Sequence, residues 1–294
     1  MNGIKSSISE KCFRIVNTVV MALFGIICLY PLYYVLVCSL SDPSEIMGVR
    51  GFILTPRGLN FDAYKAVFSN PNILSGYKVT MIVVVAATSL SLVLTSIGAF
   101  LMTRKDFAIH GLLCYMIIFT MYFSGGLIPT YLLVDKGLGL GDTLWALILP
   151  TSISVYNMLI MKANFESIPK ELEESVKIDG GNDIIVLFRI IVPLSLPVMA
   201  VMVLFYGVAN WNSWFNAMIY MRTRSKYPLQ LILREILLMN NIGTMNQDAA
   251  SDKYMIAATI KYATIIVATV PILLIYPFIQ RYFVKGMMIG AVKG

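Results

Sequence analysis

Charged residues are scarce in this chain of 294 residues. Lys, Arg, Asp and Glu together make up 13% of the sequence, whereas 58% of it is hydrophobic. A soluble domain carries about 25% charged residues, so this chain has too few polar side chains to cover a surface that faces water. The composition therefore predicts an integral membrane protein.

Cysteine and histidine are also rare, which excludes several kinds of site. The four cysteines show no Cys-x-x-Cys spacing and lie in or beside apolar runs, so they indicate small buried side chains and not a disulfide framework. The single histidine, His110, cannot form a histidine cluster. We expect no metal site in this chain.

The common catalytic and nucleotide-binding motifs are missing. The sequence has no Gly-x-x-x-x-Gly-Lys-Ser/Thr loop, no Gly-x-Ser-x-Gly elbow and no His-Glu-x-x-His pair. The net charge of +7 fits loops that face anionic lipid, and the basic residues form no stripe for nucleic acid. A secondary carrier or an intramembrane enzyme would place ionisable groups within the spans, and none stands out. The sequence therefore indicates a transport protein that forms a path through the membrane but carries no nucleotide-binding or ion-coupling site of its own.

Six apolar runs are long enough to cross a bilayer, at residues 15–40, 78–102, 112–134, 143–163, 190–215 and 257–279. We expect an all-α membrane protein with an N-terminal cytoplasmic segment, residues 1–14, and one transmembrane domain, residues 15–294. Basic residues divide almost evenly between the two sides. The short turn at Arg104-Lys105 favours both termini inside.

Small and hydroxylated residues are frequent in the second run, residues 78–102. Such residues let helices approach closely within lipid, and they are also tolerated in any membrane helix because their hydroxyls bond to the preceding turn. The sequence leaves central packing and simple tolerance as equal alternatives.

Between the fourth and fifth runs lies a charged segment, residues 167–193. Ser167 as N-cap, Pro169 in the first turn and a stop at Gly180-Gly181 predict a helix of about three turns. Ile168, Leu172 and Val176 recur every four residues and are expected to share a packing face. A helix so short needs tertiary contacts. Docking to another protein is favoured over binding to lipid, because the helix carries three glutamates against two lysines.

The spacing of this segment resembles the cytoplasmic loop of ABC-importer permeases, whose pattern is Glu-Ala-Ala, three residues, Gly, nine residues and Ile-x-Leu-Pro. Residues 174–176 (Glu-Ser-Val) take the place of the first triplet, Gly180 follows after three residues, and residues 190–193 (Ile-Ile-Val-Pro) follow after nine. The departures from the pattern are Ser and Val for the two alanines and Val for the leucine. All three are small or apolar.

Four further segments are similar to the carbohydrate branch of that family, and to its second permease subunit in complex-oligosaccharide and alginate-type importers. They are residues 123–131 (FSGGLIPTY), 211–216 (WNSWFN), 227–235 (YPLQLILRE) and the tail 276–294. The resemblance implies six spans with both termini in the cytoplasm of a bacterium, in its cell membrane.

The resemblance also implies partners. A second, related permease would complete the path, two ATPase subunits would bind ATP and Mg, and an extracellular solute-binding protein would deliver the carbohydrate. The loop at residues 164–189 would dock on the ATPase. The residues expected to couple the two are Ile168, Leu172, Glu174, Ser175, Val176, Asp179, Gly180 and Pro193.

Interleaved amides and aromatic rings near the end of the fifth run are candidates for the sugar path. Rings stack on sugars, and amides serve hydroxyls as both donor and acceptor. An aromatic belt at the membrane interface is an equal alternative. The candidates are Asn210, Trp211, Asn212, Trp214 and Asn216, with Tyr156 and Asn157 in the fourth run.

Overall fold

The computed structural model describes residues 7–46, 52–106, 108–245, 259–275 and 277. Within these ranges the regular structure is helical, apart from one isolated β-bridge between Ser41 and Leu59, so the all-α prediction is confirmed. The tail motif at residues 276–294 lies outside the described residues, except for Pro277. The prediction of one transmembrane domain over residues 15–294 stays a prediction.

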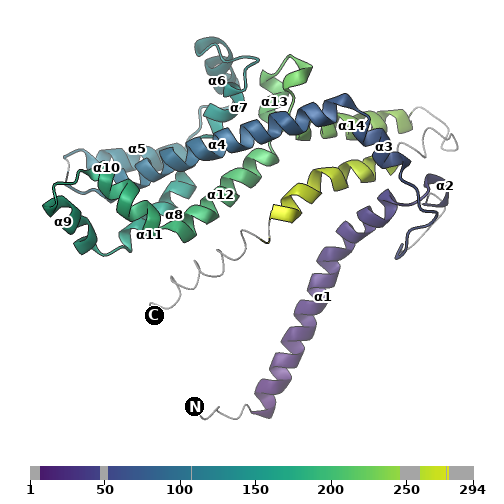
Figure 1. Ribbon diagram of the computed structural model, residues 1–294, viewed down its shortest axis with the longest axis horizontal. Helices are drawn as coiled ribbons and strands as arrows, with labels where there is room; N and C mark the ends of the chain where they lie inside the picture. The colour runs from purple at the N-terminus through teal and green to yellow at the C-terminus, as the bar shows by residue number, and fades with distance from the viewer. Residues whose placement is uncertain (1–6, 47–51, 107, 246–258, 276, 278–294) are drawn as a thin grey trace. The chain divides into compact units, whose positions relative to one another are not determined.

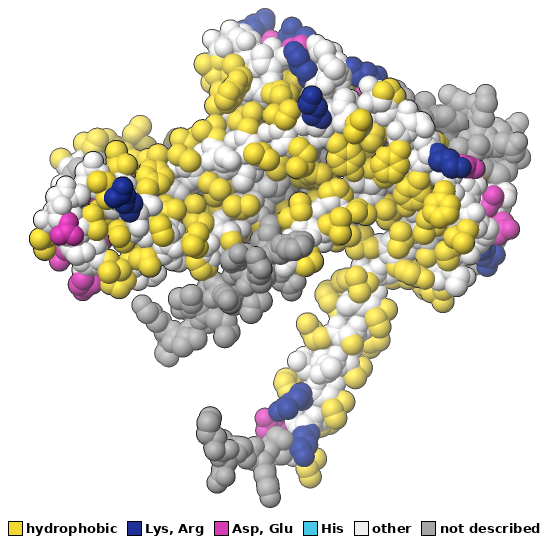
Figure 2. All heavy atoms as spheres, viewed as in Figure 1, with side chains coloured by type: hydrophobic (Ala, Val, Ile, Leu, Met, Phe, Trp, Pro, Cys, Tyr) yellow, Lys and Arg dark blue, Asp and Glu magenta, His cyan; other side chains and the backbone are white. Residues whose placement is uncertain are grey.

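The chain separates into two compact units, which are described one at a time. The first comprises residues 1–70 and 236–269, and the second comprises residues 71–235 and 270–294. In the first unit, α1 (Ile8–Ser39) contains the first predicted span, and α2 (Pro43–Ile46) and α3 (Asp62–Phe68) follow it. Hydrophobic side chains cover α1 along its length, with charged ones near its start (Figure 2). A small core of Val37, Cys38 and Ile53 holds its end.

The second unit is organised around α4 (Pro71–Thr103), a helix of 33 residues and therefore about 50 Å long. It packs against α8 (Val155–Glu166) and α12 (Leu196–Trp211) (Figure 1). Hydroxyl side chains of α4 face these contacts: Ser91, Thr95 and Ser96 are buried. The structure therefore favours central packing over simple tolerance for this serine- and threonine-rich span.

Three predicted spans are each broken by a sharp bend. The bend angles are 110° between His110–Tyr122 and Leu127–Gly137, 51° between Trp145–Thr151 and Val155–Glu166, and 86° between Asp183–Leu194 and Leu196–Trp211. Gly126 has a φ of +84° at the first break, and Pro193 and Pro197 flank the third. Both residue types interrupt regular helix.

By length and composition alone, two of the described helices, α1 and α4, could each cross a membrane. The number of possible spans rises to five if each of the three bent helix pairs is taken as one span. The described part of the sixth run is the helix Thr259–Ile275, which is shorter. The number of six spans and the orientation therefore stay predictions.

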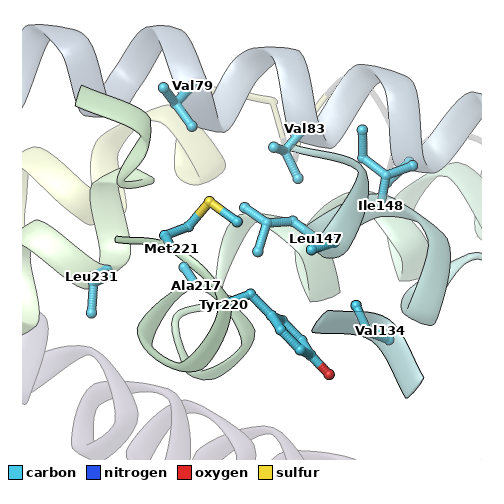
Figure 3. Close-up of a cluster of buried hydrophobic side chains, with 11 residues drawn as sticks. Val79, Val83, Val134, Leu147, Ile148, Ala217, Tyr220, Met221 and Leu231 are labelled. Atoms are coloured by element: carbon cyan, nitrogen blue, oxygen red, sulfur yellow. The ribbon is translucent and has the colours of Figure 1, made fainter. Parts of the chain in front are cut away.

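The remaining elements of the second unit lie around α4. They are α5 (His110–Tyr122), α6 (Leu127–Leu132), the π-helical turn η1 (Leu133–Gly137), α7 (Trp145–Ile148), η2 (Leu149–Thr151), α9 (Lys170–Ile178), α10 (Asp183–Ile185), the π-helical turn η3 (Val186–Ile191), α11 (Val192–Leu194), α13 (Phe215–Tyr220), η4 (Arg224–Lys226) and the first seven residues, 229–235, of α14 (Leu229–Met245), whose remainder belongs to the first unit. Figure 3 shows the core that Val79 and Val83 of α4 form with side chains of α7 and α13, among them Leu147 and Tyr220.

Next to this core, hydrogen bonds join the loop that contains Asp142 to residues 222–226. The carboxylate of Asp142 accepts hydrogen bonds from the hydroxyl and N–H of Thr223, from the N–H of Arg222 and from Nζ of Lys226. These bonds, with the Thr223 hydroxyl first, hold the pKa of Asp142 well below its ordinary value. The loop after η1 is thereby fixed to the segment before α14.

Candidate functional site

Helix α9 lies in the predicted coupling segment, but it begins later than the sequence predicted. Ser167 is the C-cap of α8, since its N–H donates to the carbonyl of Asn164 at 3.1 Å. The N-cap prediction for Ser167 is therefore wrong. Pro169 takes that position, and the helix runs for nine residues from Lys170. Figure 1 shows α9 near the Thr103 end of α4.

The C-terminal end of α9 closes with a Schellman motif at Gly180-Gly181. The N–H of Gly180 donates to the carbonyl of Lys177, and the N–H of Gly181 donates to the carbonyl of Val176 at 2.8 Å. Gly180 has a φ of +80°, which favours glycine. At Gly181 a Cβ atom would collide with Cγ1 of Val176 and lie 2.9 Å from the Val176 carbonyl oxygen. The two glycines are therefore required for different reasons.

The predicted apolar face of α9 is only partly present. Ile168 and Val176 pack against a core cluster that includes Phe100 and Met102. Leu172 is 41% exposed, so its assignment to the packing face is wrong. Glu173, the residue after Leu172, instead turns toward the bundle and is only 15% exposed.

Glu173 meets the residue that follows α4. Its Oε2 lies 2.5 Å from Nη1 of Arg104, and the two side chains are only 15% and 18% exposed. Glu174, Ser175 and Asp179, by contrast, are exposed. Glu174 and Arg104 line a cavity of about 470 Å³ beneath α9. Glu173 therefore pairs within its own bundle, whereas Glu174 lines the cavity and remains exposed.

Pro193 lies in α11, directly before the 86° bend into α12. The N–H of Ser195, at the bend, donates to the carbonyls of Ile191 and Val192. The segment that begins at α9 therefore leads through a kinked connection into one of the two helices that pack on α4.

A second candidate site is a cavity of about 190 Å³ between α8 and α12. It begins where the helix axis breaks after η2, and it is lined by Thr151, Ser154, Asn157, Phe205, Tyr206, Ala209, Asn210 and Ser213. Asn157 is 7% exposed and Asn210 is 6% exposed. Among the described residues, none hydrogen-bonds to the side-chain amide of Asn157. This buried amide therefore faces a polar cavity with its donors and acceptor unused.

Hydroxyl groups fix the wall of this cavity. The Tyr206 hydroxyl lies 2.6 Å from Oγ1 of Thr95 and accepts from the N–H of Ser154 at 3.3 Å. Asn210 donates to the carbonyl of Tyr206 and accepts from the hydroxyl of Thr151. The arrangement joins α4, α8 and α12 and leaves uncharged polar groups toward the cavity, which suits ligands rich in hydroxyls.

The other path candidates do not join this cavity. Trp211 is buried with its ring 6.3 Å from that of Tyr77, and the Trp214 ring lies under the guanidinium of Arg234 at 3.5 Å. Tyr156 is 58% exposed. Asn212 is exposed, and Asn216 is half-buried on α13. Of the seven candidates, the structure brings together Asn157 and Asn210.

Several residues at these sites were missed from the sequence. Arg104 and Glu173 gave no signal, because ordinary surface residues also flank apolar runs. Thr151, Ser154 and Tyr206 form the cavity wall, and the polar sequence Thr-Ser-Ile-Ser at residues 151–154, inside an apolar run, was the available signal.

Comparison with known proteins agrees with the resemblance. The family model described as "Binding-protein-dependent transport system inner membrane component" matches residues 90–289. The polygalacturonan/rhamnogalacturonan transport system permease protein YtcP of Bacillus subtilis is 42% identical over 93% of this chain and 96% of its own length. Protein LplC of the same organism is 41% identical over 97% of this chain and 96% of its own length.

A solved structure shares the fold. It is a bacterial ABC transporter involved in the import of the acidic polysaccharide alginate. One of its chains is 29% identical, with a TM-score of 0.82 over 96% of this chain and 100% of that chain. The ABC-importer permease fold that the resemblance implies, known as the type I permease fold, is thereby confirmed. The chain belongs to the family of binding-protein-dependent transport system inner membrane components.

Proposed function

We propose that this chain, a permease subunit of a carbohydrate ABC importer, forms half of a translocation path for oligosaccharides and is driven by an ATPase that docks on α9. Its relatives are named for transport of polygalacturonan or rhamnogalacturonan and of arabinooligosaccharides, and its structural neighbour for alginate import. All of these are chains of sugar units. The observation that carries the proposal is the short, capped, outward-facing α9 beside the end of the central helix α4.

The partners follow from this role. A second, related permease forms the other half of the path, two ATPase subunits hold ATP and Mg, and a solute-binding protein delivers the sugar. The complex lies in the bacterial cytoplasmic membrane, with both termini of this chain inside. This chain is not itself an enzyme, since hydrolysis takes place in the ATPase subunits.

The contact with the ATPase uses the outward face of α9. Leu172 supplies an exposed apolar side chain, Glu174 a charge, and Ser175 and Asp179 polar groups near the end of the helix. An amphipathic helix that inserts into a groove is a recurring mode of recognition. Closure of the ATPase dimer around ATP moves α9, and Pro193 directs this motion into α12. ATP drives the conversion between the inward-open and outward-open states only because it binds one of these two states more tightly than the other.

Sugar passes the cavity between α8 and α12. Asn157 and Asn210 offer amide groups, and Thr151 and Ser154 offer hydroxyls, so the cavity holds donors and acceptors without charge. We assign the other five candidate residues to the rest of the sugar path or to the membrane interface. They are Tyr156, Trp211, Asn212, Trp214 and Asn216. We place sugar contact first at Asn157, because its amide is buried and faces the cavity.

The coupling role is tested with Glu174→Lys in the complete complex in proteoliposomes. We expect uptake to fall at least about fivefold, the lower end of ordinary coupling between sites, while the spans remain folded. Glu45→Lys is the matched control, because it makes the same charge reversal at an exposed residue of α2, far from α9 in sequence. Full saccharide-stimulated hydrolysis and uptake in Glu174→Lys would remove α9 from the coupling path.

The substrate class is tested by uptake of defined saccharides. The complex and its solute-binding protein are given labelled oligogalacturonides, alginate oligomers and arabinooligosaccharides, with free monosaccharides as the control. We expect uptake of at least one oligosaccharide to depend on ATP. ATP-dependent uptake of monosaccharides alone would contradict the proposed substrate class.

A further inference from the structure

The ion pair between Arg104 and Glu173 differs from the other described ion pairs in its burial. Both side chains are mostly buried, at 18% and 15% exposure. Other pairs expose at least one partner much more: Arg222 is 69% exposed in its pair with Asp135, and Lys177 and Asp183 are 48% and 59% exposed. Exposed ion pairs contribute little to the stability of the fold. Removing the partner of a buried charge, in contrast, destabilises the fold strongly, because the remaining charge is left buried and unpaired.

Arg104 is held on the bundle side by an aromatic ring. Its guanidinium carbon lies 4.0 Å from the ring centroid of Phe100, one helical turn earlier. Phe100 is 5% exposed and belongs to the core shared by α4, α8 and η3. A cation over an aromatic face is attracted to it. The guanidinium is therefore attached to the core through Phe100 and to α9 through Glu173.

The other links between α9 and the bundle are few. Helix α9 contains no buried residue, and its apolar contact with the core is made by the half-buried Val176, with Ile168 just before it. A nine-residue helix is marginal by itself. The ion pair is thus a strong, directional link between α9 and the end of α4.

The cavity beneath α9 leaves this link room to move. Nε and Nη2 of Arg104 have no hydrogen-bond partner among the described residues. The residues that line the cavity of about 470 Å³ include Glu174 and Lys170. Among the described residues, the pair is therefore not part of a larger hydrogen-bonded network.

We propose that Arg104 and Glu173 form a tie that transmits displacement of α9 to α4. This inference rests on the proposed docking of the ATPase on α9. When α9 moves, separating the two charges would leave a buried carboxylate without its partner, so α4 follows. Because α4 packs against both α8 and α12, its motion reaches both walls of the polar cavity. Arg104 is a positioning residue, and the sequence pattern of the coupling loop does not include it.

The test measures uptake per ATP hydrolysed in proteoliposomes that contain the complete complex. The variants are Arg104→Gln, Glu173→Gln and the charge reversal Arg104→Glu/Glu173→Arg. Retention of ATPase subunits on the purified permease is measured in parallel. Asp183→Asn is the control, because it removes the exposed pair with Lys177 at 3.7 Å and is expected to leave the ratio unchanged.

We expect each single variant to retain its ATPase subunits and to lower uptake per ATP at least about fivefold, the lower end of ordinary coupling between sites. The charge reversal is expected to raise the ratio above that of either single variant, because it restores the ion pair but not the contact of position 104 with the Phe100 ring. A pair that only stabilised the fold would lower the amount of complex and leave the ratio unchanged, and that result would overturn the proposal.

If one of the single variants fails to assemble, the charge-reversal variant provides the test of the tie. Assembly with a ratio above that of the single variant that does assemble supports the tie, whereas a ratio no higher than that, or no assembly, overturns it. Glu174→Lys separates this inference from the proposed docking. If Glu174→Lys uncouples the complex and Arg104→Gln does not, the tie alone is wrong. If Glu174→Lys has no effect, the docking itself is wrong.

Discussion

Gly181→Ala is predicted to open the C-terminal end of α9. The new Cβ atom would collide with Cγ1 of Val176 and lie 2.9 Å from the Val176 carbonyl oxygen, which accepts the N–H of residue 181 itself. Overpacking of this kind costs about 1–3 kcal/mol. A central value of about 2 kcal/mol shifts the equilibrium between closed and open ends roughly 30-fold.

Hydrogen–deuterium exchange of the purified complex measures this shift directly. The amide of residue 181 is hydrogen-bonded at 2.8 Å in the closed motif, so its exchange should accelerate by about 30-fold. Docking should weaken as well, because the apparent affinity falls with the fraction of competent helix.

Gly180→Ala is the matched comparison, since nothing lies within 4 Å of its Cβ position. Gly180→Ala should cost only the free energy of holding alanine in the left-handed backbone conformation, about 1–2 kcal/mol. Adding Val176→Ala should therefore rescue Gly181→Ala in part and leave Gly180→Ala unrescued, with Val176→Ala alone as the reference. Exchange of Gly181→Ala within about threefold of the natural protein, or the absence of rescue, would refute the steric argument.

Three further predictions concern other parts of the second unit. Asn157→Ala should raise the KM for the transported saccharide about fivefold, the value of one lost hydrogen bond, with normal assembly. Asp142→Asn should lower the melting temperature at pH 7; because the pKa of Asp142 is lowered in the folded state, this deficit should persist above about pH 4 and shrink as the pH falls further. Thr80→Val should destabilise the complex by about 1–3 kcal/mol in denaturant unfolding, because the buried N–H of Leu229 loses its acceptor at 2.8 Å.

Two of these predictions have a matched control variant, and the third is checked by the direction of its pH dependence. Lys162→Gln, also on α8, removes a pair with Glu166 and should leave the KM unchanged, so an equal rise in both variants would assign the Asn157 effect to α8 as a whole. Thr120→Val removes a hydroxyl that bonds only to its own helix, at the Ile117 carbonyl. A loss as large as that of Thr80→Val would contradict the role of the Leu229 contact. A deficit of Asp142→Asn that grew on acidification would reverse the sign of the linkage.

Local spacing made the coupling segment predictable. The Gly180-Gly181 stop and the position of Pro193 depend on neighbours in sequence, since a Schellman motif and a proline kink are formed within a few residues. The start of α9 was predicted wrongly at Ser167, because the preceding helix α8 runs on to Glu166 and uses Ser167 as its own cap. Competition between adjacent helices for one capping residue is not visible in a local pattern.

The inward face of α9 required the tertiary structure. Periodicity assigned Leu172 to the core and gave Glu173 no role. The end of α4 places Arg104 opposite Glu173, and a charged pair across 69 residues of sequence leaves no trace in the spacing of either segment. The same holds for Asn157 and Asn210, which meet in one cavity only because α8 and α12 both pack on α4.

The sequence by itself determined that the chain is a membrane protein, that its regular structure is helical, and that residues 167–193 hold a short helix closed at Gly180-Gly181, in a spacing that resembles the loop of ABC-importer permeases. These follow from composition, apolar run length and short-range spacing, which act within one segment. Tertiary structure alone decided which spans bend, which two of seven candidate side chains share a cavity, and which charge connects α9 to α4. Those outcomes depend on how distant helices pack, because packing selects the face that each helix buries.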